Sequence, residues 1–268
     1  MTTHASQGQH WYARDGQPMY EVMAKDGTMR PATLRDARKH GWVPGVTSII
    51  KCAAAPALNR WKEDQSILAA LTLPRTGDEP HDVLMARIRQ DAAAQAEKAR
   101  DWGTAFHAAI QGHFEGKPPS EEMWPCVRGV VDALEANFDR RDWLTEAACA
   151  HPMGYGTKAD LHDSGLGSAS CGVVVDFKGS EFDAAKAPKL ETWDEHHMQL
   201  AATRMALDLP GADCAIVYVS RTVPGLCRVI RIDEPELEQG WAMFQALLAF
   251  WQARNNYYPQ NWQAKEAA

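Results

Sequence analysis

GVVVDFK, at residues 172–178, is typical of a buried β-strand that ends on charged residues. Three β-branched valines in succession favour an extended chain. Because residues i and i+2 of a strand share a face, Asp176 and Lys178 point to one side and Phe177 points to the opposite, buried side. The segment therefore predicts a core strand that presents one carboxylate and one ammonium group together.

A second short strand lies upstream, GTKADL at residues 156–161, and it also carries a carboxylate near its end, that of Asp160. The linker DSGLGS at residues 163–168 is rich in turn-forming residues and predicts a hairpin between the two strands. Pairing about the centre of this linker places Asp160 within a few residues of Asp176. Two adjacent carboxylates repel each other, and the ammonium of Lys178 is a small counter-charge. We therefore expect a divalent metal between them, with metal-assisted hydrolysis of a phosphodiester as the chemistry.

The length of 268 residues is enough for one large domain with a well-buried core. The first residues lack the apolar core of a signal peptide, and no apolar run is long enough to span a bilayer. We therefore expect a soluble, cytoplasmic protein with no membrane partner. The net charge of −7 excludes a simple polycationic DNA-coating protein but is compatible with a nuclease, whose carboxylates hold metal.

The cysteines are spread along the chain without a CxxC pair, at Cys52, Cys126, Cys149, Cys171, Cys214 and Cys227. This spacing argues against a zinc ribbon and against a compact iron–sulfur site. It favours reduced thiols in the core of a protein from a reducing compartment.

Hydrophobic periodicity predicts a mixed α/β (α+β) fold in which a mixed central sheet is flanked by helices. Residues 1–81 read as short strands and turns, with one helix near residues 57–62 and a hairpin at the Asp26-Gly27 pair. Residues 72–82 read as a loop. Beyond this loop we expect helices near residues 82–114, 121–138, 196–207 and 235–255, and strands near residues 146–151, 155–161, 172–177, 215–219 and 228–232.

The order strand, Asp160, turn, strand, Asp176-x-Lys178 and helix resembles the core of the PD-(D/E)XK nuclease superfamily. Further motifs resemble the RecB-like and phage-type exonuclease branch, which includes mitochondrial genome maintenance exonucleases. They are GTAFH at residues 103–107 (the family's GTxxH), PGVTSII at 44–50, LNRWK at 58–62 and HMQLAA at 197–202 (the family's QLxxY). The sequence departs from the family pattern at Gln111, where a Glu often stands, and at Thr203, where a Tyr is expected.

The resemblance implies a site for Mg²⁺ or Mn²⁺ that is built on Asp160 and Asp176. It adds His107 as a third ligand, although a histidine on an apolar helix face is as readily a core residue. An imidazole suits Mn²⁺ better than Mg²⁺. In the family pattern, Lys178 would orient or help to deprotonate the attacking water and stabilise the charge of the transition state. Gln199 would organise the site and contact the strand being cut.

The resemblance also implies nucleic-acid contacts from the N-terminal segments and from the GTxxH helix. Arg60, Trp61 and Lys62 combine two cations with an aromatic ring, a mix that suits a base beside backbone phosphates. Glu146, at the head of the strand before Asp160, is either a further carboxylate of the metal site or a polar strand end. The candidate nucleic-acid-binding residues are Thr47, Ser48, Arg60, Trp61, Lys62 and Thr104.

The resemblance implies that residues 1–81, with strands and a helix, form a partly helical, DNA-contacting N-terminal elaboration, and that residues 82–268 form the nuclease core. The implied activity is a metal-dependent exonuclease that hydrolyses linear DNA, single- or double-stranded, to 5′-phosphorylated products. Phage-style recombination or DNA-end processing is the expected setting, beside a single-strand annealing protein. Two alternatives stay open. A PD-(D/E)XK endonuclease would share the metal site but also cut circles, and a nucleic-acid-binding or assembly protein with a decayed site would bind DNA without cleaving it.

Overall fold

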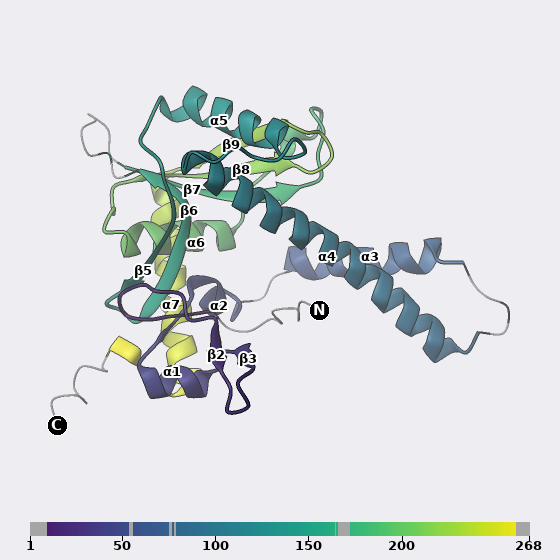
Figure 1. The fold of residues 1–268 in the computed structure, drawn as a ribbon, viewed down its shortest axis with the longest axis horizontal. Helices are drawn as coiled ribbons and strands as arrows, with labels where there is room; N and C mark the ends of the chain where they lie inside the picture. The colour runs from purple at the N-terminus through teal and green to yellow at the C-terminus, as the bar shows by residue number, and fades with distance from the viewer. Residues whose placement is uncertain are drawn as a thin grey trace.

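The fold is built on a mixed β-sheet that runs through the centre of the molecule (Figure 1). The computed structural model describes residues 10–53, 56–74, 77, 79–163, 165 and 172–260, without the side chains of residues 56–58, 61, 62 and 95. Among these residues the largest sheet has five strands in the order β5-β6-β7-β8-β9. Their bounds are Leu144–His151, Tyr155–Asp163, Val173–Ser180, Asp213–Ser220 and Cys227–Ile232.

The strands β7 and β8 are parallel, whereas the other neighbours in this sheet are antiparallel. A parallel pair cannot be joined by a tight turn and needs a crossover. Here the crossover contains the short 3-10 helix η1 (Ala187–Lys189) and the helix α6 (Asp194–Ala206). The crossover matters for the site, because it lays α6 across the charged face of β7.

Helices cover both faces of the sheet. On one face α4 (His81–Phe114) and α5 (Trp124–Phe138) pack against Phe177, Val217 and their neighbours. On the other face α6 and α7 (Glu234–Asn255) pack against Val174 and Ile216. The predicted mixed α/β core, a central sheet flanked by helices, is therefore confirmed.

The side chains of β7 alternate between the two faces of the sheet, as the sequence predicts. Phe177 is 2% exposed and lies edge-on to Phe106 of α4, with 5.7 Å between ring centroids. Asp176 and Lys178 lie together on the opposite side, where their charged groups are 2.6 Å apart. The two-residue period of a strand thus separates a hydrophobic core face from a charged face on the same segment.

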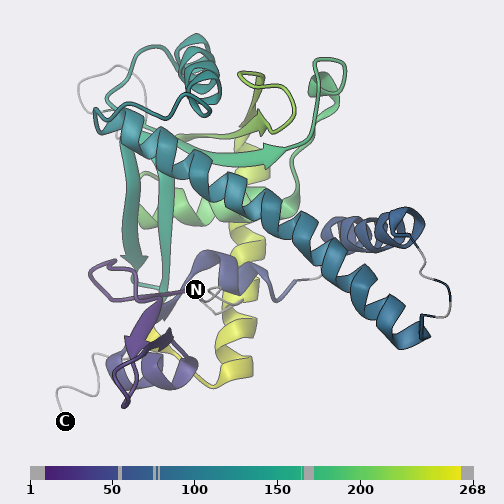
Figure 2. The same ribbon diagram turned by 45° about the vertical axis from the view of Figure 1, so that its right-hand side comes forward.

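Residues 10–53 form an N-terminal lobe beside the β5–β6 hairpin (Figure 2). The predicted hairpin is confirmed, because β2 (Glu21–Met23) and β3 (Met29–Pro31) pair antiparallel on either side of Asp26-Gly27. The strands β1 (Trp11–Tyr12) and β4 (Val43–Pro44) form a second small pair.

The expectation of strands and turns alone in this lobe is wrong, because the structure has two short helices there: α1 (Leu34–His40) and α2 (Val46–Ile50). Asp36 reaches back to the backbone N–H of Thr33 and begins α1, and Gly41 ends it with a φ of 71°. In α2, Val46 and Ile49 are buried in the core of the lobe, and this packing overrides their β-propensity.

A helical arm projects from the body. It consists of α3 (Pro56–Thr72) and the outer part of α4, which lie side by side in both views (Figures 1 and 2). The helix α4 has 34 residues and is therefore about 50 Å long. Its inner end, which carries Phe106 and Ile110, packs on the sheet. The predicted loop lies between α3 and α4, although residues 75, 76 and 78 are outside the described part.

The described cysteines Cys52, Cys126, Cys149, Cys214 and Cys227 are all free thiols. The sixth, Cys171, lies outside the described residues. In the part of the chain that the structure describes, no helix combines the length and the apolar character needed to cross a membrane.

Candidate active site

The candidate site lies where the strands β6 and β7 separate. The ladder pairs Leu161 with Val175, and the next pair in this register would be Asp160 and Asp176. At that point Oδ2 of Asp160 accepts a hydrogen bond of 3.0 Å from the backbone N–H of Phe177. The hairpin expected from the linker is therefore confirmed, and its register, which is centred a few residues after the middle of the linker, brings the two predicted carboxylates to the same place on the sheet.

A triangle of polar contacts surrounds the Asp176 carboxylate. Oδ2 lies 2.6 Å from Nζ of Lys178. Oδ1 accepts a hydrogen bond of 2.6 Å from Nε2 of Gln199 on α6, and Oε1 of Gln199 accepts one of 3.2 Å from Nζ of Lys178. The side chain of Asp176 is 8% exposed, so these contacts fix its orientation in a largely dry environment.

The ionised carboxylate of Asp160 is in an electrostatically unfavourable position. Burial, together with repulsion from Asp176, raises the pKa of Asp160 to about 6, although His107, Lys178 and the N–H of Phe177 oppose the shift. For Lys178, burial alone would lower the pKa, but the two carboxylates outweigh it and raise the pKa above its usual value. Two carboxylates sharing one ammonium in this way suit an additional cation.

Two more ligand-type side chains reach Asp160 from other elements. His107 on α4 places Nδ1 3.5 Å from Oδ1 of Asp160, and its side chain is 33% exposed. Glu146 on β5 joins them, because ligand atoms of His107, Glu146 and Asp160 all lie within 4.8 Å of one another. Oxygen atoms with one imidazole nitrogen form a donor set that suits Mg²⁺ or, better, Mn²⁺.

Glu146 has an unusual backbone. It is the third residue of β5, and its φ of 53° lies in the left-handed region that non-glycine residues rarely adopt. Its carboxylate also forms an ion pair with Lys158 of β6. A strained residue whose side chain joins a cluster of metal-type ligands fits a functional position. Sequence reasoning left its role open, and no sequence signal predicts this conformation.

The predicted nucleic-acid contacts are spread over the N-terminal lobe and the arm. Ser48 is buried in α2, where its hydroxyl accepts a hydrogen bond of 2.9 Å from the backbone N–H of His10. Thr47 beside it is half-buried. Thr104 is exposed on α4, and Arg60 is exposed on α3. Trp61 and Lys62 also lie in α3, but their side chains are outside the described part.

The two departures from the family pattern have local structural roles. Gln111 donates a hydrogen bond of 2.7 Å to Glu115, one turn further along α4. Thr203 on α6 shares a hydrogen bond of 2.9 Å with the buried hydroxyl of Thr157 on β6. The hydroxyl of Thr203 therefore ties α6 to the strand that carries Asp160.

A residue that sequence reasoning missed is His196, one helical turn before Gln199. Burial, with the nearby ammonium of Lys178, lowers the pKa of His196 to about 4. Its Nδ1 accepts a hydrogen bond of 3.2 Å from the backbone N–H of Trp193, and its ring lies edge-on to Tyr218. A neutral imidazole thus borders the charged face of β7, and its position three residues before Gln199 was the only available signal.

No family model matches the sequence, and no curated protein matches it. Among solved structures, the chain is similar to SSO0001, with 15% identity, 78% of this chain and 91% of that chain covered, and a TM-score of 0.32. It is also similar to LHK-Exo in complex with dAMP (15% identity, 76% and 93% covered, TM-score 0.32). A third structure is the alkaline exonuclease LHK-Exo from Laribacter hongkongensis, with 16% identity, 78% and 100% covered, and a TM-score of 0.31. Similarity at this level does not assign a function, which has to come from the geometry of the site.

Proposed function

We propose that this chain is a divalent-metal-dependent DNA nuclease that acts from strand ends and leaves 5′-phosphorylated products. The observation that carries the proposal is the arrangement of Asp160, Asp176 and Lys178 where β6 and β7 separate. Two carboxylates on adjacent strands with one ammonium beside them destabilise a fold unless something else binds there. A divalent cation would neutralise the two carboxylates, and a phosphate would neutralise the ammonium.

Asp160, Asp176, His107 and Glu146 are the residues that would hold Mg²⁺ or Mn²⁺. The bound ion supplies positive charge to the phosphate and makes water more acidic. The pKa of Asp160, raised to about 6 by burial and by Asp176, fits such a site, because a cation removes the repulsion between the carboxylates. The imidazole of His107 favours Mn²⁺.

The remaining chemistry falls to Lys178 and Gln199. Lys178 has a raised pKa and is therefore an ammonium group at neutral pH. It can donate hydrogen bonds to the attacking water or to a phosphate oxygen, and it stabilises the negative charge that grows as the fifth P–O bond forms. Gln199 contacts both Lys178 and Asp176, so it keeps the ammonium and the carboxylate on the same side of the phosphate.

We further propose that residues 82–268 act as the nuclease core and residues 1–81 as a DNA-contacting elaboration. The core part contains every residue of the candidate metal site. Thr47, Ser48, Arg60, Trp61, Lys62 and Thr104 are kept as proposed nucleic-acid contacts. Linear DNA is the proposed substrate, in recombination or DNA-end processing beside a single-strand annealing protein.

The decisive experiment compares end-labelled linear DNA with a covalently closed circle, in Mg²⁺, Mn²⁺ or EDTA. We expect the wild type to degrade the linear DNA with either metal and to leave the circle intact. Asp176→Ala abolishes the activity, whereas Asp132→Ala, which removes an exposed carboxylate on α5, leaves it unchanged. Cutting of the circle would indicate an endonuclease. Binding without cleavage in any metal would indicate a nucleic-acid-binding protein and overturn the proposal.

A further inference from the structure

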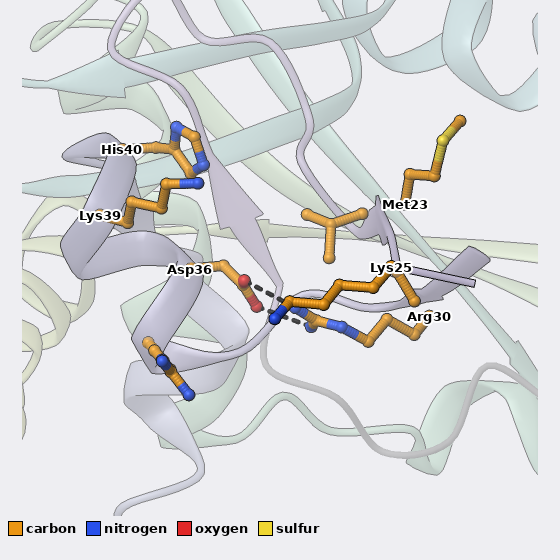
Figure 3. Close-up of a pocket in the computed structure, with 9 residues that line it drawn as sticks. Met23, Lys25, Arg30, Asp36, Lys39 and His40 are labelled. Atoms are coloured by element: carbon orange, nitrogen blue, oxygen red, sulfur yellow. Dashed lines mark hydrogen bonds and ion pairs between the residues drawn. The ribbon is translucent and has the colours of Figure 1, made fainter. Parts of the chain in front are cut away.

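A cationic pocket lies in the N-terminal lobe (Figure 3), and its lining residues include none of the candidate metal site. It has a volume of about 630 Å³ and lies between the β2–β3 hairpin and α1. In Figure 3, Lys39 and His40 border it from α1, Lys25 and Arg30 border it from the hairpin, and Asp36 lies between them. Arg35 adds a further guanidinium, so one carboxylate faces four permanent cations.

The carboxylate of Asp36 is already hydrogen-bonded within the lobe. Arg30 donates two hydrogen bonds of 2.8 Å to it, and Thr33 donates two more from its N–H and its hydroxyl. The Arg30 guanidinium, with the help of Thr33, holds the pKa of Asp36 well below its usual range. Asp36 therefore stays ionised and neutralises Arg30, which leaves the other cations of the pocket without compensation.

Lys25, Arg35 and Lys39 form no ion pair or hydrogen bond with any residue in the part of the chain that the structure describes. The nearest hairpin carboxylate in sequence, that of Asp26, accepts hydrogen bonds of 3.0 Å and 2.7 Å from Thr28 within its own turn. Three unpaired cations around one hollow repel one another, and an anion between them relieves that repulsion.

The charge distribution of the chain points to the same conclusion. Residues 1–53 contain seven Lys or Arg and four Asp or Glu, a net charge of +3, although the whole chain carries −7. A nuclease of this overall charge must attract a polyanion with a local positive surface. The N-terminal lobe supplies that surface, and the pocket contains four of its seven cations.

The pocket is anchored to the strand that carries the active site. The ring of Tyr12 lies over Gly156 of β6, where a side chain would come within 2.6 Å of it. The hydroxyl of Tyr12 lies 3.1 Å from that of Tyr20, which directly precedes the hairpin. Asp160 is four residues further along β6 than Gly156, roughly 13 Å at about 3.3 Å per residue. The hairpin that borders the pocket is thus connected, through Tyr20 and Tyr12, to the strand that carries Asp160.

We propose that this pocket binds backbone phosphates of the DNA strand, as a second contact outside the catalytic centre. The inference rests on the proposed function, since the strand is the proposed substrate. Val22 and Met23 form an apolar wall of the pocket, and Met23 is 73% exposed. This wall suits the sugar or base beside the phosphates. The same phosphates also occur on free nucleotides, so the experiment has to separate the two sources.

The test measures DNA affinity without cleavage, by fluorescence anisotropy of a labelled DNA of about 30 nucleotides in EDTA. The pocket variant is Arg35→Glu/Lys39→Glu, which changes two exposed residues of α1. The matched control is Arg140→Glu/Arg228→Glu, which makes the same change of net charge at exposed positions near α5 and β9. A milder pair, Arg35→Gln/Lys39→Gln, guards against a folding defect in the Glu variant.

We expect the Glu variant to bind at least about tenfold more weakly than the control at low salt, with the Gln pair in between. The slope of log K against log[salt] should fall by about 2, because two phosphate contacts are lost. Equal affinities of the pocket variant and the control would overturn the proposal. So would tight binding of dAMP that depends on Arg35 and Lys39 while DNA affinity stays unchanged, since the ligand would then be a free nucleotide.

Cleavage is scored separately. In steady-state cleavage of linear DNA, the pocket variant should keep the wild-type kcat, because the metal site is untouched. Its KM should rise, because DNA binds more weakly. If the wild type fails to cut DNA in any metal, the proposed function fails, yet the anisotropy result still decides whether the pocket binds phosphates.

Discussion

The side-chain amide of Gln199 donates a hydrogen bond to Oδ1 of Asp176 across 2.6 Å, and so connects α6 to the charged face of β7. The other oxygen of the same carboxylate contacts Lys178. Asp176 is therefore held from both sides, by a neutral donor and by a cation. A carboxylate with both oxygens engaged keeps one orientation, which a metal ligand requires.

Gln199→Ala should lower kcat by about 10- to 100-fold and change KM little, because the loss of a supporting contact disorders Asp176 and Lys178 without removing either. Steady-state cleavage of linear DNA measures this. Thr203→Ala is the control, since it removes a buried hydroxyl from the same helix at a cost of about 1 kcal/mol in unfolding free energy. An equal loss of kcat in both variants would show general damage to α6 in place of a positioning role.

Lys178→Met should reduce cleavage by at least about 10³-fold, because the ammonium stabilises charge that develops in the transition state. Metal affinity should not fall, and we expect it to rise, since the variant removes a cation 2.6 Å from Asp176. Calorimetric titration with Mn²⁺ of the wild type and the variant tests both halves. Loss of metal binding together with cleavage would mean that Lys178 holds the site together, with no separate catalytic role.

Asp160→Asn should stabilise the metal-free protein at about pH 8. Burial and repulsion from Asp176 raise the pKa of Asp160 in the folded wild type from the ordinary 3.8 of an aspartate to about 6. A raised pKa means that the folded state binds the proton more tightly, so the wild type gains stability as the pH falls from about 8 to about 4. At high pH the ionised Asp160 carries a penalty of about 3 kcal/mol in the free energy of unfolding. The Asn variant avoids it and keeps an acceptor for the N–H of Phe177.

Urea unfolding of both proteins in EDTA, at about pH 4, 6 and 8, measures the difference. It should be largest at pH 8 and disappear near pH 4. Addition of Mn²⁺ should raise the midpoint of the wild type and leave that of Asp160→Asn unchanged. A variant less stable than the wild type at pH 8 would contradict the assignment of Asp160 as a carboxylate under repulsion.

The central part of the fold follows from local sequence rules. The two-residue period of GVVVDFK places Phe177 in the core and Asp176 beside Lys178, because a strand has no other way to direct successive side chains. The hairpin of β6 and β7 follows from a linker rich in turn-forming residues, which brings Asp160 close to Asp176. Both predictions concern residues close in sequence, where backbone geometry leaves few alternatives.

Features that depend on distant contacts could not be predicted. The helix α1 buries only Ala37 among its seven residues, so it has no apolar stripe, and only its capping residues mark its ends. The φ of Glu146 depends on the point where β5, β6 and α4 meet. The cationic pocket combines a hairpin with a helix whose packing no periodicity specifies. Tyr257 has no sequence signal, yet its hydroxyl donates to the carbonyls of Ala37 and Trp42 and fastens the lobe.

Glu146 gives the sharpest comparison, because Glu146→Ala and Glu146→Gly remove the same carboxylate but differ in backbone strain. Glycine adopts a φ of 53° at no steric cost, whereas alanine does not. We expect the Gly variant to be more stable than the Ala variant by about 1 kcal/mol in EDTA, the reverse of the usual order inside a strand. Both should bind Mn²⁺ about 10- to 100-fold more weakly than the wild type if the carboxylate belongs to the metal site.

Lys158→Met completes the set, since it removes the partner of Glu146 and leaves the carboxylate in place. The freed carboxylate has a stronger attraction for a cation, so Mn²⁺ should bind this variant more tightly than the wild type. Unchanged Mn²⁺ affinity in all three variants would limit Glu146 to its ion pair with Lys158. A stability order with Ala above Gly would show that the left-handed backbone at Glu146 is not retained in solution. The two readouts are independent, because strain is measured without metal and ligation is measured with it.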